Sequence, residues 1–257
     1  MVNYNSIPIY SEVNWNLTSE ACHMILIAPS GAGKTMLLSY LAGMLLKQGH
    51  ILSVIDAKNT AFGAVYKSIG IQTAVSPDEI IMMLANLVRE MEQDYKKYFS
   101  DKNISISSNF STLKLPAHVL IFDEVLSALD SGDKKQKQEM IKLLKLLALK
   151  GRMAGYVIVL TSQRLLSTDL PKSVTEQCQT RLIMGANVSE ELFHTLTGMY
   201  KKDLGRTYIG EVGKGYAVTP TTGLTYFEAP YMDFKKYNFR EIMKKMKERG
   251  ANHGKSG

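Results

Sequence analysis

Four uninterrupted apolar runs mark the first two thirds of the chain, at residues 22–28, 51–57, 118–124 and 155–163. Each run has the length of a buried strand rather than of a helix. Strands are apolar throughout, instead of alternating, when helices cover both faces of a sheet. Because longer segments with a different pattern separate the runs, we predict parallel strands joined by crossover helices. The expected fold class is α/β, with a mainly parallel, doubly wound sheet.

Amphipathic helices are predicted between these runs, at residues 33–49, 76–99 and 134–151. Gly49 closes the first of them, as glycine often does at helix ends. Ser76 is a preferred N-cap residue, and Pro77 suits the first helical position of the second. Residues 101–116 are polar and rich in serine, which predicts a loop.

The pattern changes after Thr180. Shorter apolar runs separated by turns follow, at residues 180–186, 206–212, 214–220 and 224–230. Such runs predict extra antiparallel strands along one edge of the sheet. The last segment is basic with helical spacing. We therefore divide the chain into an N-terminal segment (1–20), a principal domain (21–230) and a basic helical tail (231–257).

Net charge and cysteine usage limit the possible binding partners and the redox state of the thiols. The 257 residues carry a formal net charge of +7, and from residue 233 onward eight Lys or Arg face only three acidic residues. Such a basic end suits an anionic polymer or an acidic membrane surface, and it equally suits a solubilising tail. Cys22 and Cys178 lie far apart, without metal-binding spacing, in or beside apolar runs. We predict that both are reduced core residues.

No apolar run approaches the roughly 20 residues that span a bilayer. The beginning of the chain lacks the basic start and apolar centre of a secretion signal. We therefore expect a cytoplasmic protein without an integral membrane segment.

The stretch "LIAPSGAGKT" (26–35) matches the phosphate-binding pattern GxxxxGK[ST] except that Ala28 replaces the first glycine. In this pattern, backbone N–H groups at a helix N-terminus wrap a phosphate. Alanine is costly at the first position only if the backbone there needs a positive φ. The loop follows an apolar strand and opens a helix, which is the context that the motif requires. We predict nucleotide binding by residues Ser30, Gly31, Ala32, Gly33, Lys34, Thr35 and Met36.

The cofactors that this loop implies are ATP and Mg²⁺. Lys34 would reach the β- and γ-phosphates, and the Thr35 hydroxyl would bind the metal ion. The run "HVLIFDE" supplies Asp123 and Glu124 at the carboxyl end of a strand. There Asp123 would hold Mg²⁺ through water, and Glu124 would polarise the attacking water. These residues predict an ATPase, or at least an ATP-binding switch.

The segment "LALKGRMAGYVIVLTSQRLL" (147–166) resembles the FtsK/HerA superfamily of hexameric DNA-pumping motors, which have a GR-aG turn, an apolar strand and then TQRP. Four other segments are similar to motifs of this superfamily in the same order: "HMILIAPSGAGKT", "VIDAKN", "EQCQTRLIMGANVSEEL" and "GKGYAVTPTTGLTYFEAP". The likeness covers roughly residues 15–230. This chain lacks the proline of TQRP, has Ala57 in place of another proline, and shows neither a membrane domain nor a winged helix.

The resemblance implies a RecA-like P-loop NTPase fold and a homo-oligomeric ring of six protomers on double-stranded DNA. Gln163 matches the polar sensor of the γ-phosphate or attacking water, which joins Lys34 and Glu124 as catalytic residues. Arg152 matches an arginine that reaches into the neighbouring protomer's site; the alternative is a cation that complements the dipole at a helix C-terminus. Arg181 is a second candidate for such a contact, or a charge at a strand edge.

The function implied is an ATP-hydrolysing double-stranded DNA translocase, stimulated by DNA, in plasmid or mobile-element transfer, replication or packaging. Candidate DNA contacts are the 101–116 loop and Lys134, Lys135 and Lys137. The tail could bind a relaxase, a replication or packaging protein, a neighbouring subunit, DNA or a membrane. Two alternatives remain: an ATP-dependent loader or switch without processive translocation, and a DNA-binding structural protein with a vestigial ATP site.

Overall fold

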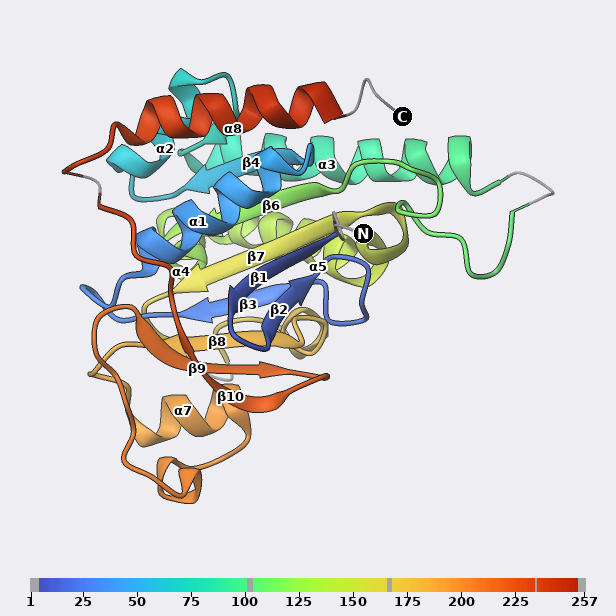
Figure 1. Cartoon of the computed structure of the whole chain (residues 1–257). Coiled ribbons are helices and arrows are strands. Elements are labelled where there is room, and N and C mark those ends of the chain that lie inside the picture. Colours follow the sequence, from blue (N-terminus) through green and yellow to red (C-terminus); the bar gives the residue numbers. More distant parts are fainter. Residues whose placement is uncertain (1–4, 101–103, 166–167, 234, 254–257) are drawn as a thin grey trace.

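A computed structural model describes residues 5–100, 104–165, 168–233 and 235–253 (Figure 1). Its centre is an eight-stranded sheet with the strand order β10-β9-β8-β3-β7-β6-β4-β5. The strands are β3 (Met24–Ile27), β4 (Ile51–Asp56), β5 (Gln72–Ala74), β6 (His118–Asp123), β7 (Tyr156–Ser162), β8 (Thr180–Met184), β9 (Lys214–Thr219) and β10 (Gly223–Glu228). A separate hairpin pairs β1 (Ser6–Tyr10) with β2 (Val13–Asn16).

The parallel part of the sheet confirms the predicted doubly wound α/β fold. β3 lies between β7 and β8 and pairs with both in parallel. β6 pairs in parallel with β7 on one side and with β4 on the other. All four predicted strands form within two residues of the expected bounds, because their side chains are buried on both faces of the sheet.

The antiparallel edge differs from the expectation in two of its four runs. β8 is parallel to β3, so the run at 180–186 extends the parallel sheet. Only β9 and β10 are antiparallel additions. The run at 206–212 forms no strand, because its tyrosine packs inward instead: the Tyr208 hydroxyl donates to the Gly185 carbonyl at 3.0 Å.

Helices cover both faces of the sheet. They are α1 (Lys34–Lys47), α2 (Ala61–Ser68), α3 (Pro77–Tyr98), α4 (Val125–Ser131), α5 (Lys134–Ala154), α6 (Lys172–Thr175), α7 (Glu190–Thr197) and α8 (Phe239–His253), with a 3₁₀ turn at Lys201–Leu204. The three helices expected from apolar spacing are present. Ser76 caps α3 as predicted, accepting from the Glu79 N–H at 3.4 Å in a capping box. The described part of the 101–116 loop has neither helix nor strand, and residues 101–103 lie outside the described chain.

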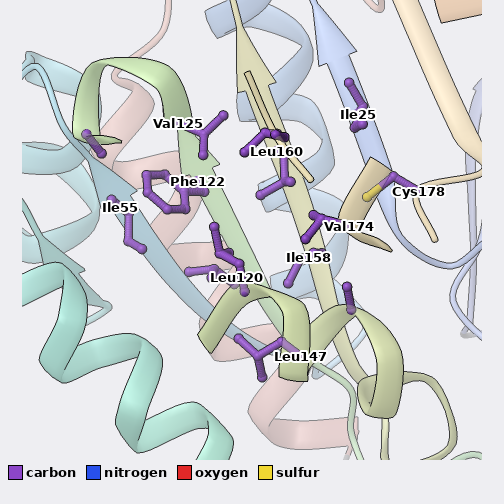
Figure 2. Close-up of a cluster of buried hydrophobic side chains, with 14 of the residues drawn as sticks. Ile25, Ile55, Leu120, Phe122, Val125, Leu147, Ile158, Leu160, Val174 and Cys178 are labelled. Atoms are coloured by element: carbon purple, nitrogen blue, oxygen red, sulfur yellow. The ribbon is translucent and has the colours of Figure 1, made fainter. Parts of the chain in front are cut away.

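Two apolar layers sandwich the sheet. On one face, α3 and α5 pack against each other and against side chains such as Phe122, Ile158 and Leu160 (Figure 2). On the other face, α1, α2 and α8 share a layer with the β1–β2 hairpin. Trp15 of this hairpin is fully buried and donates its indole N–H to the Cys22 carbonyl at 2.7 Å.

Both cysteines are buried free thiols, as the sequence predicts. Burial raises the pKa of Cys22 to about 12, which makes its thiol unreactive at neutral pH. Among the described residues, no helix is long and apolar enough to cross a membrane.

The basic tail ends in a helix that packs onto the rest of the domain. Met243 of α8 is 1% exposed, and its methyl group fills the space above Gly43 of α1. The Lys247 ammonium donates to the carbonyls of Ile69 at 2.8 Å and Gly70 at 3.1 Å. The apolar side of this helix is therefore used within the chain, which leaves only its cationic side for another molecule.

Candidate nucleotide-binding site

The phosphate loop joins the carboxyl end of β3 to the amino end of α1, at the centre of the sheet. Ala28, which replaces the first glycine of the pattern, is fully buried, and its N–H donates to the Ser162 carbonyl at 3.0 Å. Its φ lies outside the left-handed region. The backbone therefore does not need glycine at this position, and alanine adds no strain.

Gly33 does need to be glycine. It has a φ of +95° at the N-cap of α1, and a Cβ added there would lie 3.0 Å from the Gly213 nitrogen. The Gly213 N–H also donates to the Ala32 carbonyl at 2.9 Å. A Cβ on Gly185 would lie 2.5 Å from the Ala32 Cβ. Segments that follow β8 and precede β9 thus hold the phosphate loop from behind.

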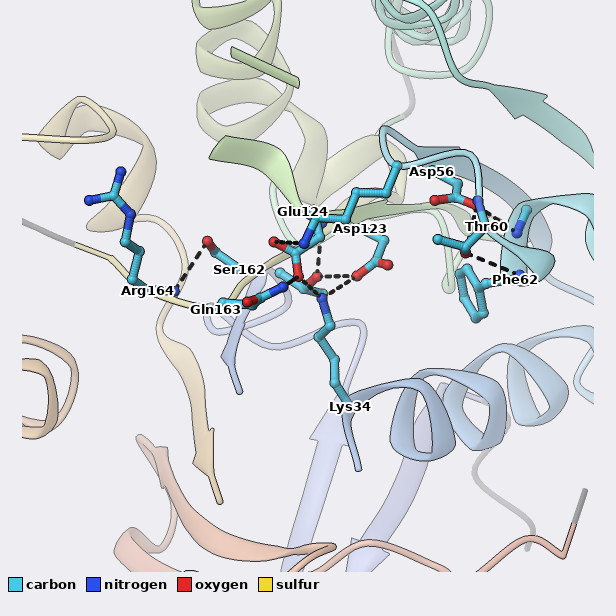
Figure 3. A network of polar contacts seen from close by, with 12 residues as sticks. Lys34, Asp56, Thr60, Phe62, Asp123, Glu124, Ser162, Gln163 and Arg164 are labelled. Carbon is cyan, nitrogen blue, oxygen red and sulfur yellow. Dashed lines mark hydrogen bonds and ion pairs between the residues drawn. The ribbon is translucent and has the colours of Figure 1, made fainter. Parts of the chain in front are cut away.

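Lys34 links the phosphate loop to the acidic pair through ion pairs (Figure 3). Its ammonium lies 2.8 Å from Asp123 Oδ1 and also donates to Glu124 Oε1. The Gln163 amide donates to the same Glu124 oxygen at 3.1 Å. The structure therefore gathers the four predicted groups, which come from α1, the carboxyl end of β6 and the residue after β7.

A second set of hydrogen bonds fixes the acidic pair. The Thr161 hydroxyl donates to Asp123 Oδ1 at 2.6 Å and accepts from the Glu124 N–H at 3.2 Å. Glu124 has a φ of +57° at the N-cap of α4, a left-handed conformation that non-glycine residues seldom adopt. Strained backbone of this kind often occurs at functional sites, where surrounding bonds hold it in place.

The electrostatics favour an ionised Glu124. Burial raises the pKa of its carboxyl group. The hydrogen bond and charge of Lys34, with smaller effects of Gln163 and Lys58, outweigh burial and hold the pKa below its usual value. The carboxylate is thus available as a base or as a hydrogen-bond acceptor at neutral pH.

Asp56 and Lys58 belong to the surroundings of this site and were not singled out in the sequence. Asp56 ends β4 in register with Asp123 of β6. Its Oδ2 accepts from the Thr60 N–H, the Thr60 hydroxyl and the Gly63 N–H at 2.7, 2.9 and 3.0 Å. The Lys58 ammonium lies 3.5 Å from Glu124 Oε2. An acid at the carboxyl end of a second buried strand was the signal that could have found Asp56.

A cleft of about 890 Å³ opens over these groups. Nine of the predicted residues line it: Ser30, Gly31, Gly33, Lys34, Thr35, Met36, Asp123, Glu124 and Gln163. Ala32 is buried behind the loop and lines a different hollow. The exposed Thr35 hydroxyl and the Asp123 carboxylate share the cleft, and hydroxyl and carboxylate oxygens are ligands that Mg²⁺ accepts beside phosphates.

Arg152 and Arg181 lie outside the cleft. Arg152 is at the C-terminal end of α5, beside the amino end of β7, with its guanidinium 3.5 Å from Glu20. β7 has seven residues and is about 20 Å long, so Arg152 cannot reach Gln163 at the other end. Arg181 donates to the carbonyls of Cys178, Leu196 and Thr175, which uses its guanidinium within the chain.

The lysines proposed as DNA contacts lie at the amino end of α5, which follows α4 directly. Lys134 and Lys135 are exposed, and Lys137 lies 3.8 Å from Asp130. α5 runs antiparallel to β7, so these lysines lie beside the carboxyl ends of the parallel strands, where the cleft is. The described part of the 101–116 loop connects α3 to β6 and lies at the amino end of β6, away from the cleft.

A phosphate loop after β3, its lysine, and an acidic pair at the carboxyl end of β6 in the same parallel sheet define a P-loop ATPase. The model of the ATPase family associated with various cellular activities (AAA) matches residues 24–186, and the chain belongs to this family.

One curated relative supports the predicted resemblance to the FtsK/HerA superfamily. The chain is 25% identical over 240 residues to the FtsK domain-containing protein YdcQ of Bacillus subtilis (strain 168). This match covers 93% of the chain and 48% of YdcQ, so the chain spans about half the length of this relative.

Solved structures share the fold. The pCW3 conjugation coupling protein TcpA, in its monomer form with ATPγS, superposes with a TM-score of 0.78 at 19% identity, over 96% of this chain and 71% of TcpA. The cytoplasmic domain of the type VII secretion ATPase EccC from Thermomonospora curvata superposes with a TM-score of 0.71 at 17% identity. That match covers 95% of this chain and 31% of the EccC chain.

Proposed function

We propose that this ATPase is a ring-forming double-stranded DNA translocase that serves plasmid or mobile-element transfer, replication or packaging. The observation that carries the proposal is that one cleft contains the side chains of Lys34, Asp123, Glu124 and Gln163. Arg152 lies away from this cleft, at the amino end of β7. The relatives named as a conjugation coupling protein and an FtsK domain-containing protein support a role in DNA transfer.

Each group in the cleft has a part in phosphoryl transfer. The loop N–H groups and Lys34 bind the phosphates, and the Thr35 hydroxyl and Asp123 would hold Mg²⁺, which neutralises developing charge. Glu124 orients and polarises the attacking water. Gln163, which is hydrogen-bonded to Glu124, would sense the γ-phosphate or the attacking water.

Arg152 completes the site of a neighbouring protomer in this proposal. Its guanidinium is half-exposed, and the single Glu20 pair is a surface contact of small energy. An arginine supplied in trans neutralises charge on the transferred phosphoryl group and can raise kcat about 10³- to 10⁵-fold. Hydrolysis would then depend on assembly.

The Lys134, Lys135 and Lys137 cluster is the proposed DNA contact. Cations in the first turn of a helix oppose its dipole, so their presence there does not stabilise α5. They suit phosphates of the DNA backbone instead, through sequence-independent and salt-sensitive contacts.

The first test is hydrolysis with and without linear duplex DNA, alongside the mass of the particle in solution. We expect ATP turnover that DNA stimulates, that rises cooperatively with protein concentration, and that accompanies a ring-sized particle. A chain that stays monomeric with ATP and duplex DNA and hydrolyses nothing would overturn the proposal.

A second test addresses Arg152. Arg152→Ala and Glu124→Gln proteins should each be inactive, and a mixture should regain activity because each supplies the group that the other lacks. If no mixture exceeds either variant alone, Arg152 does not act in trans.

The likeness to a secretion ATPase supports one further candidate: an ATP-dependent loader or switch that binds DNA or a partner without processive translocation. Slow turnover that ignores DNA and changes with a protein partner would favour this candidate over the translocase.

A further inference from the structure

The nucleotide cleft has a second wall that belongs to the C-terminal part of the chain. Tyr231, Met232, Asp233 and Lys235 line the cleft together with the phosphate loop. We name these four residues the C-terminal strap; they lie between β10 and α8, where the chain passes the amino end of α1 (Figure 1). Residue 234 lies outside the described part of the chain. None of the four belongs to the phosphate-binding motif or to the acidic pair.

A smaller pocket adjoins the cleft at this strap. It has a volume of about 200 Å³ and is lined by Tyr231, Met232, Asp233, Tyr237, Phe239 and Ile242. Its walls are mainly aromatic and apolar, whereas the large cleft contains the lysine and the carboxylates. Tyr231, Met232 and Asp233 line both pockets, so the two pockets adjoin at the strap, the large one on the phosphate side and the small one on the apolar side.

Two tyrosines of the small pocket are largely exposed to solvent. Tyr231 is 79% exposed and Tyr237 is 52% exposed, whereas Phe239 and Ile242 behind them are packed against the core. A flat, polarisable ring left at the edge of a pocket is a platform on which a base can stack. Burial of the ring against a ligand would account for this exposure.

The strap is fixed in place from both sides. The Met232 N–H donates to the Met36 sulfur at 3.2 Å, which ties the strap to the first turn of α1. Asp233 Oδ1 accepts from the N–H groups of Lys235 and Lys236 at 3.0 and 3.1 Å, which shapes the turn. α8 then anchors the chain through Met243 and Lys247. A wall held this firmly can position a ligand.

We infer that Tyr231, Met232 and Tyr237 form the subsite for the base of the bound nucleotide, while the phosphate loop holds its phosphates. The C-terminal segment is then part of the ATP site of its own protomer. This inference rests on ATP binding in the cleft and is independent of DNA translocation, so its test uses neither DNA nor hydrolysis.

The test compares two ligands that share phosphates and differ in the base. Dissociation constants of the full chain for ATP and for inorganic tripolyphosphate, each with Mg²⁺, are measured by calorimetry on wild type, Tyr231→Ala and Tyr237→Ala. Stacking of one base contributes about 1–3 kcal/mol, which corresponds to roughly 5- to 150-fold in affinity. We expect Tyr231→Ala to weaken ATP binding within this range, Tyr237→Ala to weaken it less, and tripolyphosphate binding to stay unchanged.

Matched variants make the result specific. Tyr231→Phe keeps the ring and should bind ATP as wild type does. Tyr200→Ala removes a tyrosine that is 43% exposed outside both pockets and should change neither ligand. Equal losses for ATP and tripolyphosphate in Tyr231→Ala would show that the strap only supports the phosphate loop, and unchanged ATP binding would show that no base contacts Tyr231. Either result overturns the inference.

Discussion

The central parallel strands and the C-terminal third of the molecule contribute to one site in different ways. β3, β6 and β7 are parallel, so their carboxyl ends lie on the same side of the sheet. The lysine, the acidic pair and the glutamine follow these ends and meet there. Among the described residues, none of the proposed catalytic groups comes from the C-terminal third. It supports the phosphate loop through Gly185 and Gly213 and closes the cleft through the C-terminal strap. Each catalytic motif is therefore a short stretch of sequence at the end of one strand. The segments that support the phosphate loop and line the cleft come from more distant parts of the chain.

Glu124→Gln should have the largest effect, because it removes the base from the central strands and leaves the frame intact. Loss of a general base typically lowers the rate about 10²- to 10⁴-fold. We expect kcat for ATP hydrolysis to fall by this amount while the dissociation constant for ATP changes little. Near-normal turnover would assign the base to another group.

Met243→Ala tests whether α8 is an integral part of the domain. Truncating a buried methionine costs about 2–5 kcal/mol. The matched control is Met82→Ala on α3, where the side chain is 60% exposed and the expected loss is below about 0.5 kcal/mol. Denaturant unfolding of both proteins measures the difference. Equal, small losses would mean that the helix does not contribute to the stability of the domain.

Gly185→Ala tests the support of the phosphate loop from behind. Gly185 and Gly198 both have positive φ, but only at Gly185 does an added Cβ meet another atom, the Ala32 Cβ at 2.5 Å. Both substitutions should cost about 1–2 kcal/mol for the backbone conformation. Overpacking adds about 1–3 kcal/mol at Gly185 alone and should also weaken ATP binding. Thermal unfolding and ATP titration of the two variants check this, and unchanged ATP affinity in Gly185→Ala would contradict it.

Lys134→Glu should have the smallest effect on stability, and with a positive sign. Replacing a cation by an anion in the first turn of α5 favours the helix by about 0.3–1 kcal/mol. The same change should lower DNA stimulation and reduce the salt dependence of DNA binding.

Lys150→Glu provides the control near the other end of α5, where it should slightly destabilise the protein and leave DNA binding unchanged. Equal effects of the two charge reversals on DNA would mean that net charge matters and that the position of the lysine does not.

The sequence predicted the parallel strands and the groups at their ends, because each of these signals spans only a few neighbouring residues. "HVLIFDE" shows in seven letters a buried strand and the two carboxylates after it. The prediction that the run at 180–186 forms an added antiparallel strand was wrong: β8 is parallel to β3. A short apolar run does not indicate which strand it will pair with. Lys58 was missed for a similar reason: its contact with Glu124 depends on the neighbouring positions of β4 and β6.

The docking of α8 could not be predicted because helical spacing shows only that one side is apolar. That side packs on α1 and α2, which lie about 200 residues earlier in the chain. Arg152, by contrast, lies outside the cleft of its own protomer, and the role in trans that the resemblance implies stays a prediction until the mixing experiment is done.

The contact between Ala32 and Gly185 has a consequence for how such chains can diverge. A side chain at position 185 would collide with the Ala32 side chain, because its Cβ would lie 2.5 Å from the Ala32 Cβ. Position 185 can therefore accept a side chain only together with a change at position 32, more than 150 positions earlier in the chain. Comparison of many descendants of one ancestor should therefore find the two positions constrained together.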